Sequence, residues 1–204
     1  MDKLIKFIPA ILIFFHLIGI GIFVYLDAAP DLSFITILLS AIIVFVLESN
    51  LKKAIIPFGF IFVAGYLIEL IGVQTGLLFG EYIYHPAMGP TLFGTPLIIG
   101  ATWYGVIAGA ATIASYVNGS KLGQSILAGG LAVLMDLLIE QVAVHYGLWD
   151  WKIGEIPLYN YVCWFIFGAI FAYVYLRFQE EKNKTAFWLF WIWIGFFAIL
   201  TLYR

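Results

Sequence analysis

Charged side chains are scarce in this sequence. Asp, Glu, Lys and Arg make up 11% of the 204 residues, against about 25% in ordinary soluble domains, which is too few to cover a water-facing surface. Hydrophobic residues make up 64% of the chain, and a mean hydropathy of +1.04 extends over its whole length. A signal peptide or a single anchor cannot account for this pattern. The sequence therefore predicts a multi-pass integral membrane protein, which we place in the inner or cytoplasmic membrane of the cell.

Cysteine and histidine are also rare. The single cysteine, Cys163, cannot form an intramolecular disulfide, and its apolar surroundings indicate a small buried hydrophobe. The three histidines are His16, His85 and His145, too few and too scattered for a multi-histidine di-iron site, so we expect no metal. His16 is interpreted as a polar contact between helices. The net charge of −2, with no basic stripe, makes nucleic acid an unsuitable partner.

Seven apolar runs approach the length of about 20 residues that a helix needs to cross a bilayer. They are Leu4–Leu26, Leu32–Glu48, Ala54–Leu78, Thr95–Val117, Leu122–His145, Pro157–Leu176 and Ala186–Tyr203. The second run is short, and the start of the fourth is poorly marked because no charge falls between Pro86 and Ser120. We expect an all-α bundle of about seven transmembrane helices, formed by residues 1–204 as a single domain.

Basic residues fall mostly on one side of these runs, and cytoplasmic loops retain Lys and Arg. With the N terminus inside, eight of the ten are cytoplasmic: Lys3, Lys6, Lys52, Lys53, Lys121, Arg177, Lys182 and Lys184. Only Lys152 and Arg204 lie outside, which predicts an N-in, C-out protein. The two longest connections, Phe79–Gly94 and Gly147–Ile156, then face outward. Long ordered loops often carry function, so we expect the site near that face.

Three carboxylates fall inside the apolar runs, where a charge costs several kcal/mol and indicates a functional site. Glu69 lies in the third run, and Asp136 and Glu140 lie in the fifth. The i, i+4 spacing of the last two places them on one helix face. Counting from the basic loops, Glu69 and Asp136 are at nearly the same depth, with Glu140 about one turn nearer the outer surface.

Glycine lines the helix face around Glu69. Gly65, Gly72 and Gly76 lie at positions i−4, i+3 and i+7, which leaves room for the backbone of another helix or for a ligand.

A purely structural role for the three acids is the alternative. They would then be protonated and hydrogen-bonded within the bundle, to partners such as Tyr66, Gln74 or Gln141. Glu48, at the cytoplasmic end of the second run, is interpreted as structural, either solvated or paired with Lys52.

Three ordered blocks carry a more specific signal. The segment ELIGVQTGLLFGEYIYHPAMGPTLFGTPLIIGATW, Glu69–Trp103, resembles the signature of a carotenoid biosynthesis family of membrane proteins. That family includes the CruF-type carotenoid 1,2-hydratases and the bisanhydrobacterioruberin hydratases. MDLLIEQVAVHYGLWDW, Met135–Trp151, and IPLYNYVCW, Ile156–Trp164, resemble its second and third blocks. The family commonly has Asp-Pro where this chain has Glu140-Gln141 and a small hydroxyl residue at His85, which leaves the substrate open.

The resemblance implies a hydro-lyase that adds water across the terminal C1–C2 double bond of an acyclic carotenoid and forms a tertiary 1-hydroxy carotenoid. Its implied partners are the carotenoid, the lipid bilayer and other carotenoid biosynthesis enzymes, and no cofactor is needed. A carboxyl group in apolar surroundings keeps its proton and can act as a general acid. We assign that role to Asp136, the handling of water to Glu140 and the charge balance to Glu69. The expected substrate-binding residues are Tyr82, Tyr84, Trp103, Trp149, Trp151, Asn160 and Trp164.

Three rival functions are considered. A carotenoid cyclase or isomerase begins with the same protonation, and the sequence does not determine how the cation is resolved. A proton-coupled transporter would also use buried carboxylates, but neither the repeats nor the broken helices of such proteins are evident. A retinal protein needs a mid-membrane lysine for its Schiff base, and all eight lysines fall in loops or at the N terminus.

Overall fold

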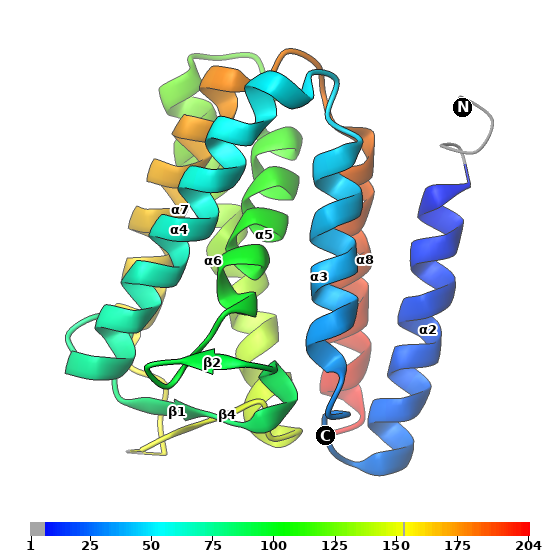
Figure 1. Cartoon of the computed structure of the whole chain (residues 1–204), viewed down its shortest axis with the longest axis vertical. Coiled ribbons are helices and arrows are strands. Elements are labelled where there is room, and N and C mark those ends of the chain that lie inside the picture. The colour runs from blue at the N-terminus through cyan, green and yellow to red at the C-terminus, as the bar shows by residue number, and fades with distance from the viewer. Residues whose placement is uncertain (1–6, 153) are drawn as a thin grey trace.

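The computed structural model describes residues 7–152 and 154–204, so Lys3, Lys6 and the beginning of the first predicted run lie outside the described residues. Within them the chain forms seven α-helices: α2 Ile8–Leu26, α3 Ser33–Val46, α4 Leu51–Thr75, α5 Ile98–Ala114, α6 Lys121–His145, α7 Leu158–Phe178 and α8 Lys184–Leu202 (Figure 1). Five of these helices are long and apolar enough to cross a membrane, and α3 and α5 are shorter apolar helices. The predicted all-α polytopic membrane bundle is confirmed.

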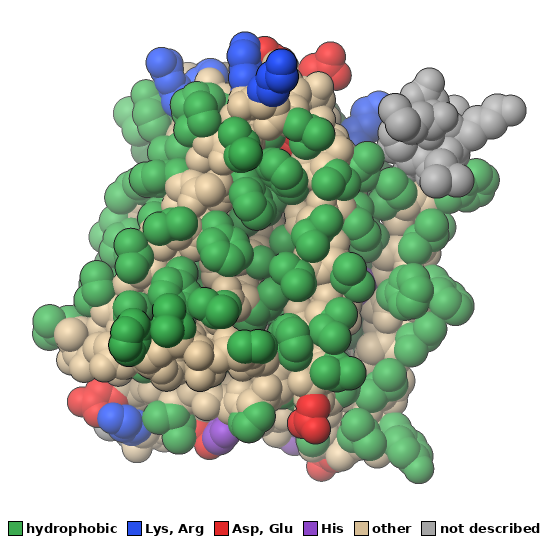
Figure 2. All heavy atoms as spheres, viewed as in Figure 1, with side chains coloured by type: hydrophobic (Ala, Val, Ile, Leu, Met, Phe, Trp, Pro, Cys, Tyr) green, Lys and Arg blue, Asp and Glu red, His purple; other side chains and the backbone are tan. Residues whose placement is uncertain are grey.

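Polar N-caps fix the starts of three long helices. Asn50 accepts a hydrogen bond from the Lys53 amide at the start of α4, Ser120 caps α6, and Asn183 caps α8. Side-chain oxygens at these positions satisfy amides that the first helical turn leaves unpaired. All three starts lie at the same end of the bundle, where Figure 2 shows Lys and Arg side chains gathered.

A small hairpin shifts the predicted start of the fourth run. The fourth run was expected to be helical from Thr95, but β3, Thr95–Pro96, pairs antiparallel with β2, Thr91–Leu92, and α5 begins only at Ile98. The two turn residues, Phe93 and Gly94, both have positive φ, the backbone of a tight two-residue hairpin. The local turn geometry therefore overrides the apolar pattern.

Helix α5 occupies the centre of the bundle, and nearly all of its side chains are buried. It packs against α3, α4, α6, α7 and α8. Its glycines allow this close packing: a Cβ at Gly100 would lie 2.5 Å from the carbonyl oxygen of Phe62 in α4, and one at Gly109 would lie 2.9 Å from that of Ala186 in α8. Small residues at helix contacts are the usual means of close packing within a membrane.

The lysine-rich end is held together by polar contacts between loops. Lys53 forms an ion pair with Glu180, and the Nζ of Lys182 lies 3.9 Å from the centre of the Tyr116 ring. The hydrogen bonds from Lys53 and Asn50 hold the pKa of Glu180 below its ordinary value. This gathering of basic residues agrees with a cytoplasmic location for this end, and the orientation in the membrane stays a prediction.

Glu48 has other partners than the one that the sequence suggested. α3 ends at Val46, and Glu48, which is half-buried, is bonded to tyrosines and not to Lys52. Its Oε1 accepts hydrogen bonds from Tyr175 on α7, at 2.5 Å, and from Tyr104 on α5, at 3.4 Å. The interpretation of Glu48 as structural is retained, but its partners come from helices that are distant in the sequence.

The opposite end of the bundle is closed by a two-stranded ribbon. Strand β1, Tyr82–Tyr84, pairs antiparallel with β4, Trp149–Trp151, and the short 3₁₀ helix η1, Pro86–Met88, follows β1. Both predicted long connections contribute to this cover, which lies across the ends of the helices in Figure 1.

Candidate functional site

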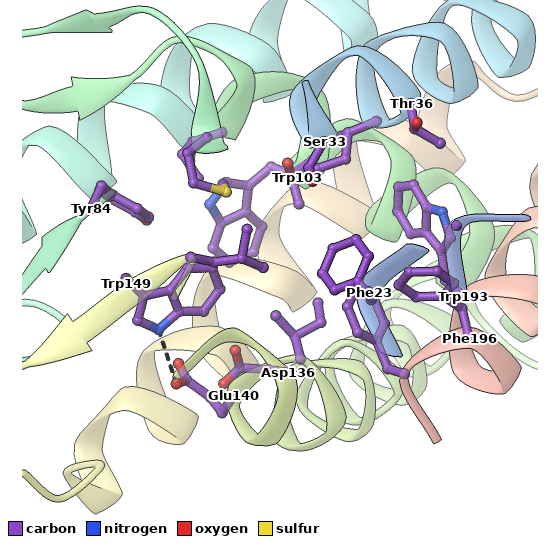
Figure 3. A pocket seen from close by; sticks show the side chains of 18 of the residues that line it. Phe23, Ser33, Thr36, Tyr84, Trp103, Asp136, Glu140, Trp149, Trp193 and Phe196 are labelled. Carbon is purple, nitrogen blue, oxygen red and sulfur yellow. Dashed lines mark hydrogen bonds between the residues drawn. The ribbon is translucent and has the colours of Figure 1, made fainter. Parts of the chain in front are cut away.

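A cavity of about 320 Å³ lies beneath the ribbon, within the bundle (Figure 3). It is lined by the three predicted acids, Glu69, Asp136 and Glu140. The seven predicted binding residues also line it: Tyr82, Tyr84, Trp103, Trp149, Trp151, Asn160 and Trp164. The fold thus brings together residues from four helices and both strands of the ribbon, while the roles of these residues stay predictions.

The strand register gives the ribbon one aromatic face. Tyr82 lies opposite Trp151, and Tyr84 lies opposite Trp149. Because side chains alternate along a strand, these four rings share the face that covers the cavity. The intervening residue of β4, Asp150, is on the other face and contacts His85 at 2.9 Å.

Glu69 on α4 is held by three donors. Its Oε2 accepts from the hydroxyls of Tyr82, at 2.5 Å, and Tyr84, at 3.1 Å, and its Oε1 accepts from the indole Nε1 of Trp103 at 3.3 Å. These bonds tie the ribbon and α5 to α4, so Glu69 also fixes the position of the cover over the cavity.

The glycines beside Glu69 make these bonds possible. A Cβ at Gly65 would lie 2.8 Å from the indole of Trp103, and one at Gly72 would lie 2.9 Å from the carbonyl oxygen of Leu78. The space predicted for another helix or for a ligand is therefore filled by Trp103 and by the chain that leads into the ribbon. Helix α4 ends just beyond, with Gly76 at a φ of +67°.

Glu140 on α6 meets the other strand of the ribbon. Its Oε2 accepts from the indole nitrogens of Trp149, at 3.1 Å, and Trp151, at 2.9 Å. An indole N–H can only donate, so this oxygen acts as an acceptor for both. In the described part of the chain no group bonds to Oε1, which leaves that oxygen for a ligand in the cavity.

Asp136 lies one turn below Glu140 on the same helix face. It is 1% exposed, and its Oδ2 accepts from the Nδ2 of Asn160 on α7 at 2.8 Å. Among the described residues no donor reaches its Oδ1. Figure 3 shows the carboxyl groups of Asp136 and Glu140 next to each other at the cavity wall. Two neighbouring acids, each with one oxygen free, are suited to moving protons.

Aromatic faces form the opposite wall. Trp103 and Trp164 line the cavity and stack with their ring centres 4.1 Å apart. Behind them, Phe171 packs edge to face against Trp103, with ring centres 5.4 Å apart. The faces of such rings attract cations. A positive charge formed against these rings would therefore be stabilised by them.

The hydrogen-bond partners suggested for a purely structural role of the acids are wrong. Tyr66 and Gln74 donate instead to backbone carbonyls of the β2–β3 hairpin, and Gln141 accepts from Arg204. The actual donors are tyrosine, tryptophan and asparagine side chains from the ribbon and from α5 and α7.

The far end of the cavity was missed by sequence reasoning. It is formed by α2, α3 and α8, including Phe23, Thr36 and Phe196. Uniformly apolar helices give no signal that one face borders a cavity.

His16 forms the predicted contact between helices, since its Nε2 accepts from the Nε1 of Trp193 at 3.1 Å. Within the described residues no three His, Cys, Asp or Glu side chains gather as metal ligands.

Comparison with known proteins identifies the family of this chain. The family model described as carotenoid biosynthesis protein matches residues 32–202. A curated relative, the bisanhydrobacterioruberin hydratase of Haloarcula japonica, is 29% identical over 113 residues, which cover 52% of this chain and 39% of that protein. The match thus spans well under half of the relative's length. No solved structure matches. Because the family model matches well over half of the chain, this chain belongs to the carotenoid biosynthesis protein family.

Proposed function

We propose that this protein is a carotenoid hydratase that adds water to the terminal C1–C2 double bond of an acyclic carotenoid end group. The observation that carries the proposal is the pair Asp136 and Glu140, each with a free oxygen in an apolar, aromatic-lined cavity. The name of the Haloarcula japonica relative supports the same reaction class.

The reaction balances without a cofactor. Asp136 gives its proton to C2, and the electron pair of the double bond forms the new C–H bond, which leaves a tertiary cation at C1. The oxygen of a water molecule then bonds to C1 and loses a proton to Glu140. Return of that proton from Glu140 to Asp136 completes the cycle, and the product is a tertiary alcohol.

The hydrogen bonds support this division of roles. Two indole donors stabilise a negative charge on Glu140, whereas Asp136 has the single amide donor of Asn160. Charges repel strongly in a low-dielectric interior, so two neighbouring acids keep one proton between them. Glu140, which has the larger number of hydrogen-bond donors, therefore carries the negative charge, and Asp136 keeps the proton.

Glu69 and the tryptophans complete the proposed site. Glu69, with three donors, sets the charge balance and holds the ribbon closed. The stacked indoles of Trp103 and Trp164 line the same cavity, so they support a role in stabilising a cation formed there. A dry cavity protects the cation from premature capture, so water must arrive in a controlled position beside Glu140.

The test is expression in a host that produces an acyclic carotenoid, followed by pigment chromatography with mass measurement. The native chain should convert the pigment to a product heavier by one water, and Asp136→Asn should leave the substrate unchanged. A product of altered retention and unchanged mass would instead indicate a cyclase or isomerase. No new pigment from a well-expressed native chain would contradict the proposal.

A further inference from the structure

The cavity continues away from the acids to the membrane-facing surface. Phe15 and Ile22 on α2 line it, and they are 58% and 41% exposed. Leu32 and Thr36, at the start of α3, line it as well, and both are exposed. Residues that border a cavity and are also exposed mark the place where the cavity opens. The opening therefore lies between α2 and α3.

The packing of these two helices explains the opening. α2 packs against α8, whereas α3 packs mainly against α5. Figure 1 shows α2 at the edge of the bundle, set apart from α3. The loop between them is held at one end, where the Ala29 amide donates to the carbonyl of Tyr146. The two helices are therefore joined at the ribbon end and separate from each other along their length.

The surface around the opening is apolar. The exposed residues on the neighbouring turns include Phe14, Ile18 and Ile35, and none of the residues that line the cavity on α2 or α3 is an Asp, Glu, Lys or Arg. A surface of this kind in a membrane protein faces lipid tails. Whatever passes through the opening is therefore apolar and comes from the bilayer.

The size of the cavity limits what it can hold. At about 320 Å³ it is at the lower end of the range of about 300–1,000 Å³ for pockets that hold drug-sized ligands. A carotenoid is a long, stiff polyene that cannot fold back on itself, so only an end group and the adjoining part of the chain fit. At the acidic end the ribbon closes the cavity through its bonds to Glu69 and Glu140.

We infer that the opening between α2 and α3 is a binding site for the polyene chain, through which a carotenoid inserts one end group while the rest of the molecule lies in the membrane. The path is lined by aromatic side chains that suit a flat conjugated chain. Phe23 and Phe196 pack edge to face with their ring centres 5.7 Å apart. Figure 3 places them with Trp193 on the side of the cavity away from Trp149.

This inference rests on the proposed function only for the identity of the end group, so binding can be tested without turnover. We would place the photo-reactive residue benzoylphenylalanine at Thr36, with Leu39 as the matched control. Leu39 lies on the same helix, is 54% exposed and does not line the cavity. The full chain would be irradiated in phosphatidylcholine vesicles that contain an acyclic carotenoid, and the adducts identified by mass.

Position 36 should capture the carotenoid, and position 39 should capture mainly phospholipid, with a ratio of carotenoid to lipid adducts about tenfold higher at position 36. Phospholipid as the main adduct at both positions would overturn the inference, because a lipid chain would then occupy the opening. Equal carotenoid capture at both positions would also overturn it, since it would reflect carotenoid dissolved in the bilayer.

A second measurement uses activity. Thr36→Trp should obstruct the opening and lower conversion of a full-length acyclic carotenoid by about tenfold, while Leu39→Trp should not. A short acyclic isoprenoid with the same end group, small enough to lie wholly inside the cavity, should lose much less activity in Thr36→Trp, because it does not occupy the opening during turnover. Equal loss with both substrates, or no loss with either, would overturn the inference.

Failure of the native chain to hydrate either substrate would contradict the proposed function. The cross-linking result would then test the binding site independently of activity.

Discussion

Asn160 on α7 donates a 2.8 Å hydrogen bond to the carboxyl group of Asp136 on α6, which joins the two helices at the level of the cavity. Glycines hold the same pair together below this bond. A Cβ at Gly129 of α6 would lie 2.7 Å from the carbonyl oxygen of Phe165, and one at Gly168 of α7 would lie 3.1 Å from Ala132. The position of the Asp136 carboxyl is therefore fixed by close helix packing as well as by its own hydrogen bond.

The variant Asp136→Asn tests the proton donor. Asparagine preserves the size of the side chain but cannot donate an acidic proton, so hydration should fall by about 10²–10⁴-fold, as for a lost general acid. The amount of carotenoid that copurifies with the protein should stay unchanged. Near-native hydration would assign the proton donor to Glu69 or Glu140 instead.

Glu140→Gln tests the handling of water. Glutamine retains an oxygen that can accept from Trp149 and Trp151 but cannot remove a proton from water, so hydration should slow while protonation by Asp136 continues. Part of the cation should then lose a proton elsewhere or cyclise, giving isomers of unchanged mass. Chromatography with mass measurement would detect them, and a native ratio of alcohol to isomers would contradict the assigned role.

Trp151→Phe and Trp149→Phe test the two indole donors separately. Phenylalanine retains an aromatic ring but removes the N–H that reaches Glu140. A hydrogen bond to a charged group contributes about 1.5–3 kcal/mol, so each variant should lower the hydration rate by roughly tenfold or more. Trp188→Phe is the control, because Trp188 is on α8, 46% exposed and remote from the cavity lining. Equal effects in all three variants would argue against a specific role of the indoles.

Tyr175→Phe tests the polar cluster around Glu48. The change removes the shorter of the two tyrosine hydrogen bonds to that carboxyl, so the free energy of unfolding should fall by about 1–3 kcal/mol. Thermal unfolding in detergent would measure the loss. Tyr173→Phe, on the exposed face of the same helix, should be close to native. Because Glu48 does not line the cavity, the activity per folded molecule should stay unchanged.

A reporter fused after Arg204 tests the orientation. With seven crossings and the N terminus inside, this fusion should read as non-cytoplasmic, whereas a fusion after Gly119, between α5 and α6, should read as cytoplasmic. The short helices α3 and α5 make this test informative, because either could fail to span the bilayer fully. A cytoplasmic signal from the Arg204 fusion would mean an even number of crossings.

Parts of the fold followed from local sequence. The long runs around α4, α6, α7 and α8 were recognisable because about twenty apolar residues between charges leave no other stable structure in a bilayer. The helix starts at Asn50, Ser120 and Asn183 agree with their capping side chains. The start of α5 was misjudged because Thr95 and Pro96 are apolar enough to extend the run, although a turn with positive φ precedes them.

The sequence alone determined that this chain is a helical membrane protein with three acids inside the bilayer, because hydrophobicity and i, i+4 spacing are local properties. Only the tertiary structure decided which oxygens of those acids remain free. Glu69 is satisfied by residues 13, 15 and 34 positions away, and Asp136 by one 24 positions away. It also decided that α2 and α3 separate to open the cavity toward lipid. Such contacts depend on how whole helices pack, and an apolar helix has the same local pattern whether its face meets a neighbour, a cavity or a lipid.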